Sequence, residues 1–367
     1  MNTAKEHFHG SDLEKIEKIF GIKKETITSF GANVNPLGIS PMLRSNLASH
    51  IDAITSYPDR EYTDLRNAIS IYTGAPLDTI MVGNGSTELI GLFIQIQEPK
   101  KALLISPTYS EYEREIQLSG GTCCYHFLKE EHNFHIDTDA LLKDITDDID
   151  LLIICNPNNP TSTIIPRDDM NRIIAHCRTT DTFVMIDETY IEFSPEMESI
   201  TSVPLTKKYS NMVILRGISK FFASPGLRLG YSICNNPELY ERMNVIKNPW
   251  TINSLAGVAG EIMFSDHDYI HETKAYIQKE REYFKEQLNE IKFVKYFDSY
   301  GNFILVKILK EEISSYDVFV HCIKKGLMIR DCSDFPGLDD HYIRFCFMNH
   351  QKNVELAEAL KEILSDN

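Results

Sequence analysis

The chain has 367 residues, of which 43% are hydrophobic, and its formal net charge is −16 at pH 7. This length exceeds one simple core, so we expect a globular protein with one large and one smaller domain. The negative charge argues against nucleic acid or an anionic membrane as a partner, and no apolar run is long enough to span a bilayer.

The eight cysteines and twelve histidines of the chain predict no metal site. The cysteines stand mostly in apolar settings without a Cys-x-x-Cys pair, and the histidines show no His-Glu-x-x-His spacing. Reduced thiols of this kind are typical of a cytoplasmic protein. The charged, His-rich start of the sequence lacks the apolar core of a signal peptide, which favours the same location.

The pattern of apolar and polar residues predicts three parts. Residues 1–40 are expected to form an N-terminal arm with one amphipathic helix at 12–20, ended by Gly21. Over residues 41–260 apolar strands alternate with polar helical segments, which indicates an α/β domain with a mostly parallel sheet sandwiched by helices. A small α+β domain is expected over residues 261–367. Its elements are strands at 303–306 and 342–345 and helices at 266–290, 317–325 and 353–364.

The strand expected at residues 80–82 leads into Gly83-Asn84-Gly85-Ser86-Thr87. Gly85 lets the backbone approach an anion, and the free N–H groups of Ser86 and Thr87 at the start of a helix bind phosphate. The paired glycines also fit, weakly, the dinucleotide loop of an oxidoreductase, but the third glycine of that motif is missing.

The next two strand ends carry polar side chains. Asn159 follows the strand at residues 151–155, and its amide can donate to an oxygen on a ligand ring, although a plain Asn-Pro turn is the structural alternative. Asp187 follows the strand at 183–186, where a carboxylate can pair with a protonated pyridine nitrogen or simply cap a helix. Tyr190, three residues on, can reach the phenolic oxygen of such a ring.

A single lysine marks the end of the strand expected at residues 212–215. Lys220 has Ser219 before it and Arg228 eight residues after it. Loss of hydration lowers the pKa of such an amine and lets it form an imine, while Ser219 and Arg228 can hold a phosphate beside it. These are the requirements of pyridoxal 5′-phosphate. A surface Ser-Lys pair before a Pro-Gly turn is the alternative.

The ordered motifs resemble the fold-type I pyridoxal-phosphate enzymes of the class I/II aminotransferase family, from residue 9 to about residue 348. Because ligands gather at the carboxyl ends of parallel strands, one shared site is expected. The resemblance makes Lys220 the imine-forming amine and Asp187 the partner of the ring nitrogen, with Tyr190 and Asn159 at the phenolic oxygen. It assigns further cofactor contacts to Gly85, Ser86, Thr87, Ser219 and Arg228 at the phosphate, to Tyr109 stacked on the ring, and to Tyr57, reaching the phosphate of the neighbouring subunit in a homodimer.

The chain departs from the family at one visible place. Thr161-Ser162 stands where the family usually has Thr-Gly. We expect this change to shift a turn without touching any chemical group.

Arg344 lies within an otherwise apolar strand, where a cation is costly unless it is paired with an anion. The resemblance implies that Arg344 binds the α-carboxylate of the substrate. An ion pair with Asp331 or Asp334 is the alternative.

Two activities of the family compete: decarboxylation of L-threonine-O-3-phosphate, in cobalamin synthesis, and transamination of histidinol phosphate, in histidine synthesis. Both use the same residues, because the bond that breaks depends on its orientation to the ring. The stretches around His9, Asn35 and Arg330 look more like the decarboxylase, and the resemblance implies that these residues bind substrate. We predict a small phosphorylated amino acid as substrate, with the decarboxylase ahead, the transaminase second, and a non-catalytic cofactor-binding regulatory module as a distant third.

Overall fold

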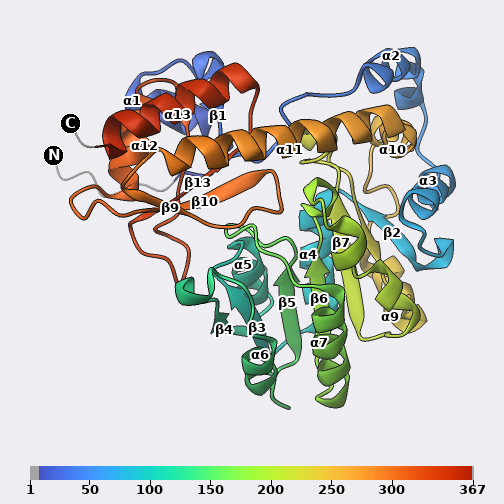
Figure 1. Ribbon diagram of the computed structural model, residues 1–367. Helices are drawn as coiled ribbons and strands as arrows, with labels where there is room; N and C mark the ends of the chain where they lie inside the picture. Colours follow the sequence, from blue (N-terminus) through green and yellow to red (C-terminus); the bar gives the residue numbers. More distant parts are fainter. Residues whose placement is uncertain (1–7, 366–367) are drawn as a thin grey trace.

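The structure is a computed structural model that describes residues 8–365, and it contains two main sheets (Figure 1). The larger sheet has seven strands in the order β2-β8-β7-β6-β5-β3-β4. All pairings from β7 to β4 are parallel, while β8 is antiparallel to both β7 and β2. The strands are β2 (Ile80–Gly83), β3 (Lys101–Ser106), β4 (Thr122–Phe127), β5 (Leu151–Cys155), β6 (Phe183–Asp187), β7 (Met212–Gly217) and β8 (Gly230–Ile233).

Alternate residues of each central strand enter two different cores, because successive side chains of a strand point to opposite faces. On β5, Leu151 and Ile153 pack in one core with helices α4, α5 and α9. Leu152 and Ile154 pack in the other with α3, α6, α7 and α10. The predicted α/β sandwich is therefore confirmed. The helices are α3 (Thr63–Thr73), α4 (Gly85–Gln97), α5 (Glu111–Leu118), α6 (Thr138–Asp144), α7 (Arg167–Thr179), α9 (Pro237–Ile246) and α10 (Ser254–Ser265).

The second sheet is antiparallel, in the order β12-β13-β10-β9, and packs with helices of the C-terminal region. The long helix α11 runs from beside α10 across to this sheet (Figure 1). The strands and helices predicted here are present within a few residues. They are α11 (His267–Asn289), β10 (Phe303–Ile308), α12 (Ser315–Ile323), β13 (Tyr342–Cys346) and α13 (His350–Leu364). The structure adds the strands β9 (Val294–Tyr296) and β12 (Arg330–Asp331), which were not predicted. The division of the chain at residues 40 and 260 stays a prediction.

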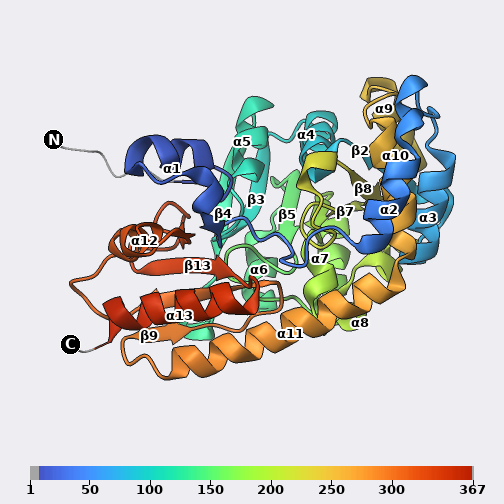
Figure 2. The ribbon, with the colours of Figure 1, turned by 90° about the horizontal axis from the view of Figure 1, so that it is seen from above.

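The N-terminal segment is joined to the second sheet's region, which the sequence did not indicate. Helix α1 (Leu13–Phe20) lies beside α12 (Figure 2), and the Phe8 and Phe319 rings stack with centroids 5.3 Å apart. Strand β1 (Thr28–Ser29) pairs in parallel with β11 (Leu327–Met328). These contacts hold the segment around His9 beside β12 and β13.

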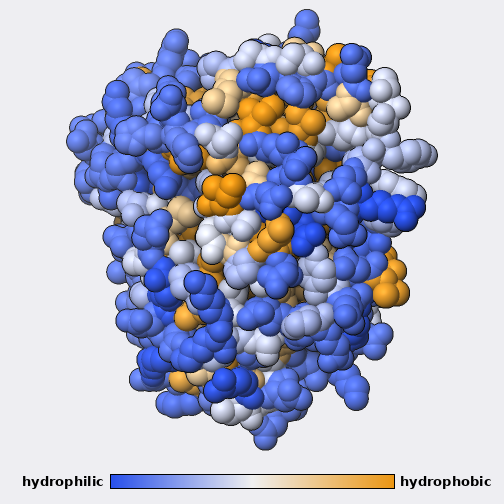
Figure 3. Space-filling view, turned by 90° about the vertical axis from the view of Figure 1, so that its right-hand side faces the viewer, coloured by the Kyte–Doolittle hydropathy of each residue, from blue (hydrophilic) through white to orange (hydrophobic). Residues whose placement is uncertain are grey.

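The side of the molecule formed by α2 (Pro41–Ser49), α3, α9 and α10 carries hydrophobic side chains among hydrophilic ones (Figure 3). The exposed apolar residues of these elements and the neighbouring turn are Met42, Ile51, Ile54, Ile71, Val245 and Ile246. The remaining helix, α8 (Met197–Ile200), is short. Within residues 8–365, no helix combines the length and the apolar character needed to cross a membrane.

Candidate active site

A cavity of about 300 Å³ opens where β5, β6 and β7 reach their carboxyl ends. It is lined by side chains from the large sheet, the second sheet and the N-terminal segment. The four motifs singled out in the sequence therefore meet in one place. The predicted site residues that line it are His9, Ser86, Thr87, Tyr109, Asn159, Asp187, Tyr190, Ser219, Lys220, Arg228, Arg330 and Arg344.

Lys220 lies in the cavity wall, three residues beyond the end of β7. Its Nζ donates a hydrogen bond of 2.7 Å to the carbonyl of Ala32. Burial, together with the nearby cations Arg344 and Arg228, lowers the pKa of this amine to about 8. A larger share of the amine is therefore uncharged and nucleophilic near neutral pH.

Asp187 ends β6 and is 5% exposed. Its Oδ1 accepts from the Thr189 amide (2.9 Å) and hydroxyl (2.5 Å), and its Oδ2 accepts from the Tyr112 hydroxyl (2.6 Å). Burial raises the pKa of this carboxyl, and the Thr189 and Tyr112 hydrogen bonds oppose the rise. Both partners are neutral, so a protonated ring nitrogen in the cavity would supply a counter-charge that neither of them provides.

Arg344 on β13 is 5% exposed. Its Nη1 donates to Asn159 Oδ1 and its Nη2 to the Gly31 carbonyl (2.7 Å), while Nε has no hydrogen-bond partner among the residues described. Burial lowers the pKa of the guanidinium. The alternative of an ion pair with Asp334 is not realised, because Asp334 pairs with Arg330 at 2.6 Å. Arg344 is thus a buried cation that can accept an anion from the cavity.

Tyr190 lines the cavity together with Arg344. Its hydroxyl accepts from Asn33 Nδ2 (3.3 Å), and its ring meets Phe303 edge-on with centroids 4.9 Å apart. Tyr109 lines the cavity and meets Tyr112 edge-on, with centroids 5.5 Å apart. Burial raises the pKa of Tyr109 to about 12, so it offers a neutral ring face.

The start of α4 and Arg228 form a second cationic end of the cavity. A Cβ placed on Gly85 would lie 2.4 Å from Arg228 Nη2, and one on Gly230 would lie 2.4 Å from the Ser86 amide nitrogen. Glycine is therefore required at Gly230, where the close atoms are backbone, and it is favoured at Gly85, whose φ is +80°. The first-turn amides, with Ser86, Thr87, Ser219 and Arg228 around them, form a cradle suited to a phosphate.

His9 and Arg330 line the cavity near Arg344. Arg330 and Arg344 are register partners on neighbouring strands, and Arg330 Nη1 donates to the Phe8 carbonyl (3.2 Å). The His9 Nδ1 lies 2.8 Å from the Ser11 hydroxyl. Burial, then the charges of Lys220 and Arg344, lowers the pKa of His9, so this ring joins a basic cluster as a mostly neutral group.

Three predicted site residues do not line the cavity: Gly85, which lies beside Arg228 and Ser86 at the start of α4, Asn35 and Tyr57. Asn35 was expected to bind substrate, but its Nδ2 donates to Phe221 O (2.7 Å), Tyr269 Oη (2.9 Å) and Thr273 Oγ1 (2.9 Å). The backbone amide of Asn35 donates to the Lys220 carbonyl (2.9 Å), so Asn35 braces the loop that carries Lys220. Tyr57 is 83% exposed and lies against Trp250, with ring centroids 5.3 Å apart.

Several neighbours of the site carried no role in the sequence-based prediction. Tyr112 lies in α5 and Tyr109 just before that helix. Their spacing of three residues places both on one side of a helical turn. Thr189 follows Asp187 by two, the spacing of a local side-chain turn. No local pattern indicates Asn33 or Ala32, which reach the cavity through the fold.

A sequence model of the family described as aminotransferase class I and II matches residues 25–360. The chain belongs to this family. It is 33% identical to the histidinol-phosphate aminotransferase of Methanosphaera stadtmanae over 369 residues, covering 100% of this chain and 98% of the relative. It is 30% identical to the threonine-phosphate decarboxylase of Salmonella typhimurium over 357 residues, covering 97% of this chain and 96% of the relative. The crystal structure of the histidinol-phosphate aminotransferase from Clostridium acetobutylicum is similar, with a TM-score of 0.86 and 35% sequence identity. The match covers 91% of this chain and 98% of that one.

This class I/II aminotransferase uses pyridoxal 5′-phosphate, as the sequence predicted. The residues present fit the cofactor at three points. Lys220 offers an amine of lowered pKa, Asp187 a buried carboxylate with only neutral partners, and the α4 terminus with Arg228 a phosphate cradle. When bound, the cofactor supplies an electron-accepting ring for bonds at the α-carbon of an amino substrate.

The pKa of Lys220 predicts how cofactor capture by this aminotransferase depends on pH. Below a pKa of about 8, the uncharged fraction rises tenfold per pH unit; at pH 7 it is roughly one in ten, against about one in three thousand for an ordinary lysine. The capture rate of cofactor-free protein should therefore rise to pH 8 and then level off. Stopped-flow absorbance measures it. A rise that continues past pH 10 would contradict the lowered pKa.

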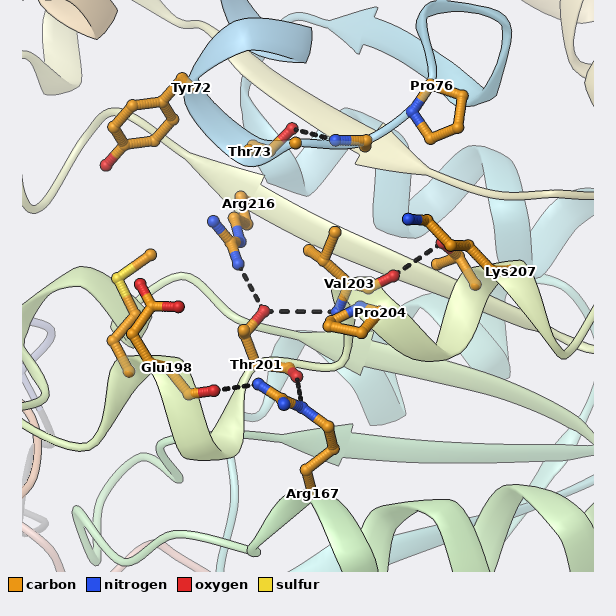
Figure 4. Close-up of a pocket in the computed structure, with 14 residues that line it drawn as sticks. Tyr72, Thr73, Pro76, Arg167, Glu198, Thr201, Val203, Pro204, Lys207 and Arg216 are labelled. Atoms are coloured by element: carbon orange, nitrogen blue, oxygen red, sulfur yellow. Dashed lines mark hydrogen bonds between the residues drawn. The ribbon is translucent and has the colours of Figure 1, made fainter.

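A second cavity, of about 250 Å³, is lined by the end of α3 and the turn after it, by residues between 197 and 207, and by Arg167 and Arg216 (Figure 4). It shares no lining residue with the active site. Arg216, 2% exposed, reaches it from β7 and donates to Glu188 Oε2 (2.7 Å) and Thr201 Oγ1 (2.8 Å). The Ser202 amide donates to Glu188 Oε1 (2.6 Å). Because Glu188 adjoins Asp187, this buried ion pair fixes the strand end that carries Asp187.

Arg216→Met should destabilise the protein. The change leaves the Glu188 carboxylate buried without its cation, which costs about 3–5 kcal/mol. Urea unfolding followed by circular dichroism measures the loss. The double variant with Glu188→Gln is the control, and it should recover part of the stability because Glu188 then carries no charge; Glu192, 3.9 Å from Arg216 in the parent, loses its partner in both variants. If the single variant were as stable as the parent, the pair would not fix this strand end.

Proposed function

We propose that this enzyme decarboxylates L-threonine-O-3-phosphate, releasing CO₂ and leaving the phosphate ester of an amino alcohol. The observation that carries the proposal is the basic cluster in the cavity wall, formed by His9, Arg330 and Arg344. It stands apart from the cradle at Arg228, which the cofactor phosphate would occupy. A substrate with both a carboxylate and a phosphate uses such a cluster fully, since each anion needs its own donors.

The residues divide the work between binding and proton movement. Arg344 would hold the substrate carboxylate through its fork of N–H donors. The Lys220 amine would deliver a proton to the α-carbon after the carboxylate has left. Asp187 would keep the ring nitrogen protonated, which sustains the pull on the electron pair. Whether the carboxylate or the α-proton leaves depends on which bond stands perpendicular to the ring, and the anion donors set that orientation.

Transamination of histidinol phosphate is the second candidate, and one observation favours it. Arg330 is already paired with Asp334 at 2.6 Å. If that pair persists with substrate bound, Arg344 and the mostly neutral His9 suit a substrate with a single anionic group. Histidinol phosphate has one phosphate and no carboxylate.

Parallel assays of the holoenzyme separate the two candidates. Threonine phosphate alone should yield CO₂ in proportion to substrate consumed, whereas histidinol phosphate should yield an amino acid product only in the presence of a keto acid. CO₂ release without keto acid supports the decarboxylase. If histidinol phosphate transfers its amino group to a keto acid and threonine phosphate releases no CO₂, the enzyme is the transaminase instead. Turnover of unphosphorylated amino acids only would remove the phosphate from the proposal, and failure to acquire a cofactor absorption band would indicate a non-catalytic module.

We further propose that the enzyme is a cytoplasmic homodimer whose C-terminal part, residues 261–367, closes over the substrate. The exposed Tyr57 ring and the apolar side chains near it support a subunit contact. All eight cysteines are free, which supports a reducing compartment. Mixing inactive Tyr57→Ala and Lys220→Ala proteins should restore partial activity if each site takes Tyr57 from its neighbour. No recovery from subunits shown to exchange would contradict a shared site.

A further inference from the structure

Ser162 adopts a backbone conformation that is unusual for its residue type. It follows Asn159 by three residues in the turn after β5, and its φ is +61°. This left-handed region favours glycine, and a serine there is strained. Its amide donates to the Asn158 carbonyl at 2.7 Å, which closes the turn. The residue is fully buried, so its side chain must find partners inside the protein.

The Ser162 hydroxyl binds the loop that precedes β10. Its Oγ accepts from the backbone amides of Gly301 (2.8 Å) and Tyr300 (3.1 Å), and the Ser162 carbonyl also accepts from the Tyr300 amide (3.0 Å). A Cβ on Gly301 would lie 3.2 Å from Oγ, so glycine suits this close approach. Ser162 therefore does more than shift a turn, because its hydroxyl binds two backbone amides that lie 138 and 139 residues away in the chain.

The loop that Ser162 holds supports two groups of the active site. Phe303, at its end, packs against Tyr190 with ring centroids 4.9 Å apart, and the Arg344 guanidinium lies 5.3 Å from the same ring. Asn302 Nδ2 donates to the Asn33 carbonyl at 2.9 Å. A shift of this loop would move the surface on which Tyr190 and Arg344 rest.

A second link to the Asn159 turn comes from β13 and passes through the cavity. Arg344 donates to Asn159, and both of these side chains are proposed to bind ligands. That bond is open to exchange when ligands enter. The bonds from Ser162 to backbone amides are buried and do not line the cavity, so they can persist while the ligand-binding groups rearrange.

We propose that Ser162 is a positioning residue, whose hydroxyl fastens the 299–303 loop to the Asn159 turn and thereby fixes Arg344 and Tyr190 for substrate. Its main effect falls on substrate binding rather than on the proton transfers at Lys220. The inference rests on the proposed catalytic use of this cavity, but not on which of the two substrates is correct. A glycine would fit the turn without strain and would lack this link.

Ser162→Gly and Ser162→Ala form a matched pair that separates the hydroxyl from the backbone. Both lose the hydroxyl, but glycine relieves the positive φ and alanine does not. Hydrogen–deuterium exchange of the holoenzyme should show the Gly301 amide exchanging about tenfold faster in both variants, the size expected for one lost hydrogen bond, while the Tyr300 amide keeps its bond to the Ser162 carbonyl. KM for the substrate that turns over should rise by a similar factor in both, with kcat within about twofold and the cofactor band unchanged.

If amide exchange in the loop and KM stayed at parental values in Ser162→Gly, the proposal would be overturned, even if Ser162→Ala were impaired. Backbone strain alone would then explain the defect of the alanine variant. A fall in kcat with unchanged KM would also overturn it. The exchange measurement needs no turnover. If neither candidate substrate reacts, the proposed function fails, and the exchange rates still decide whether Ser162 holds the loop.

Discussion

Lys220→Ala is expected to abolish turnover, with a fall of at least about 10⁴-fold, the upper range for one acid–base group. The variant loses both the amine that captures the cofactor and the group that moves protons at the α-carbon. The pKa of about 8 for this amine shows why no ordinary surface lysine can replace it, since such a lysine stays charged near neutral pH. The cofactor should then bind through its phosphate cradle alone and be lost on dialysis.

Lys247→Ala is the matched control for this prediction. Lys247 is also a buried lysine, with a pKa lowered by burial, and its Nζ donates to the Val82 carbonyl at 3.1 Å. It lines a different cavity, so the variant should keep the absorption band of the bound cofactor. Borohydride reduction followed by peptide mass analysis should place the cofactor on Lys220 in the parent. A label elsewhere, or full activity in Lys220→Ala, would refute the assignment.

The strand ends could be predicted because each combines a short apolar run with a polar residue directly after it. The runs at 151–155 and 183–186 became β5 and β6 at nearly the same bounds, since a strand buried on both faces must be apolar throughout. Parallel pairing then brings Asn159, Asp187 and Lys220 into one cavity. The roles of these residues remain predictions.

The remaining features depend on contacts between distant parts of the chain. Asn35 is held by Tyr269 and Thr273, more than 230 positions away. The Ser162 hydroxyl meets amides near residue 300, and no local periodicity encodes that meeting. Such residues look like ordinary turn or loop positions in the sequence, because the partner that gives them a role is specified elsewhere.

Asp187→Asn is expected to lower kcat by roughly 10²- to 10⁴-fold, as removing one partner of a buried charge pair costs about 3–5 kcal/mol. The amide keeps the shape of the carboxylate and can still accept from Thr189. It cannot hold a proton on the ring nitrogen, so the ring withdraws electrons less strongly. Attachment of the cofactor through Lys220 should persist, which separates this variant from Lys220→Ala.

Tyr112→Phe gives a graded comparison for Asp187→Asn. Its hydroxyl donates to Asp187 Oδ2 at 2.6 Å, and the variant removes that bond without removing the charge. Losing a hydrogen bond to a charged group costs about 1.5–3 kcal/mol, which corresponds to roughly 10- to 100-fold in kcat. Steady-state kinetics with the cofactor saturated test the order. If Asp187→Asn lost no more activity than Tyr112→Phe, the charge of Asp187 would not drive the reaction, because orientation by hydrogen bonds alone would account for both effects.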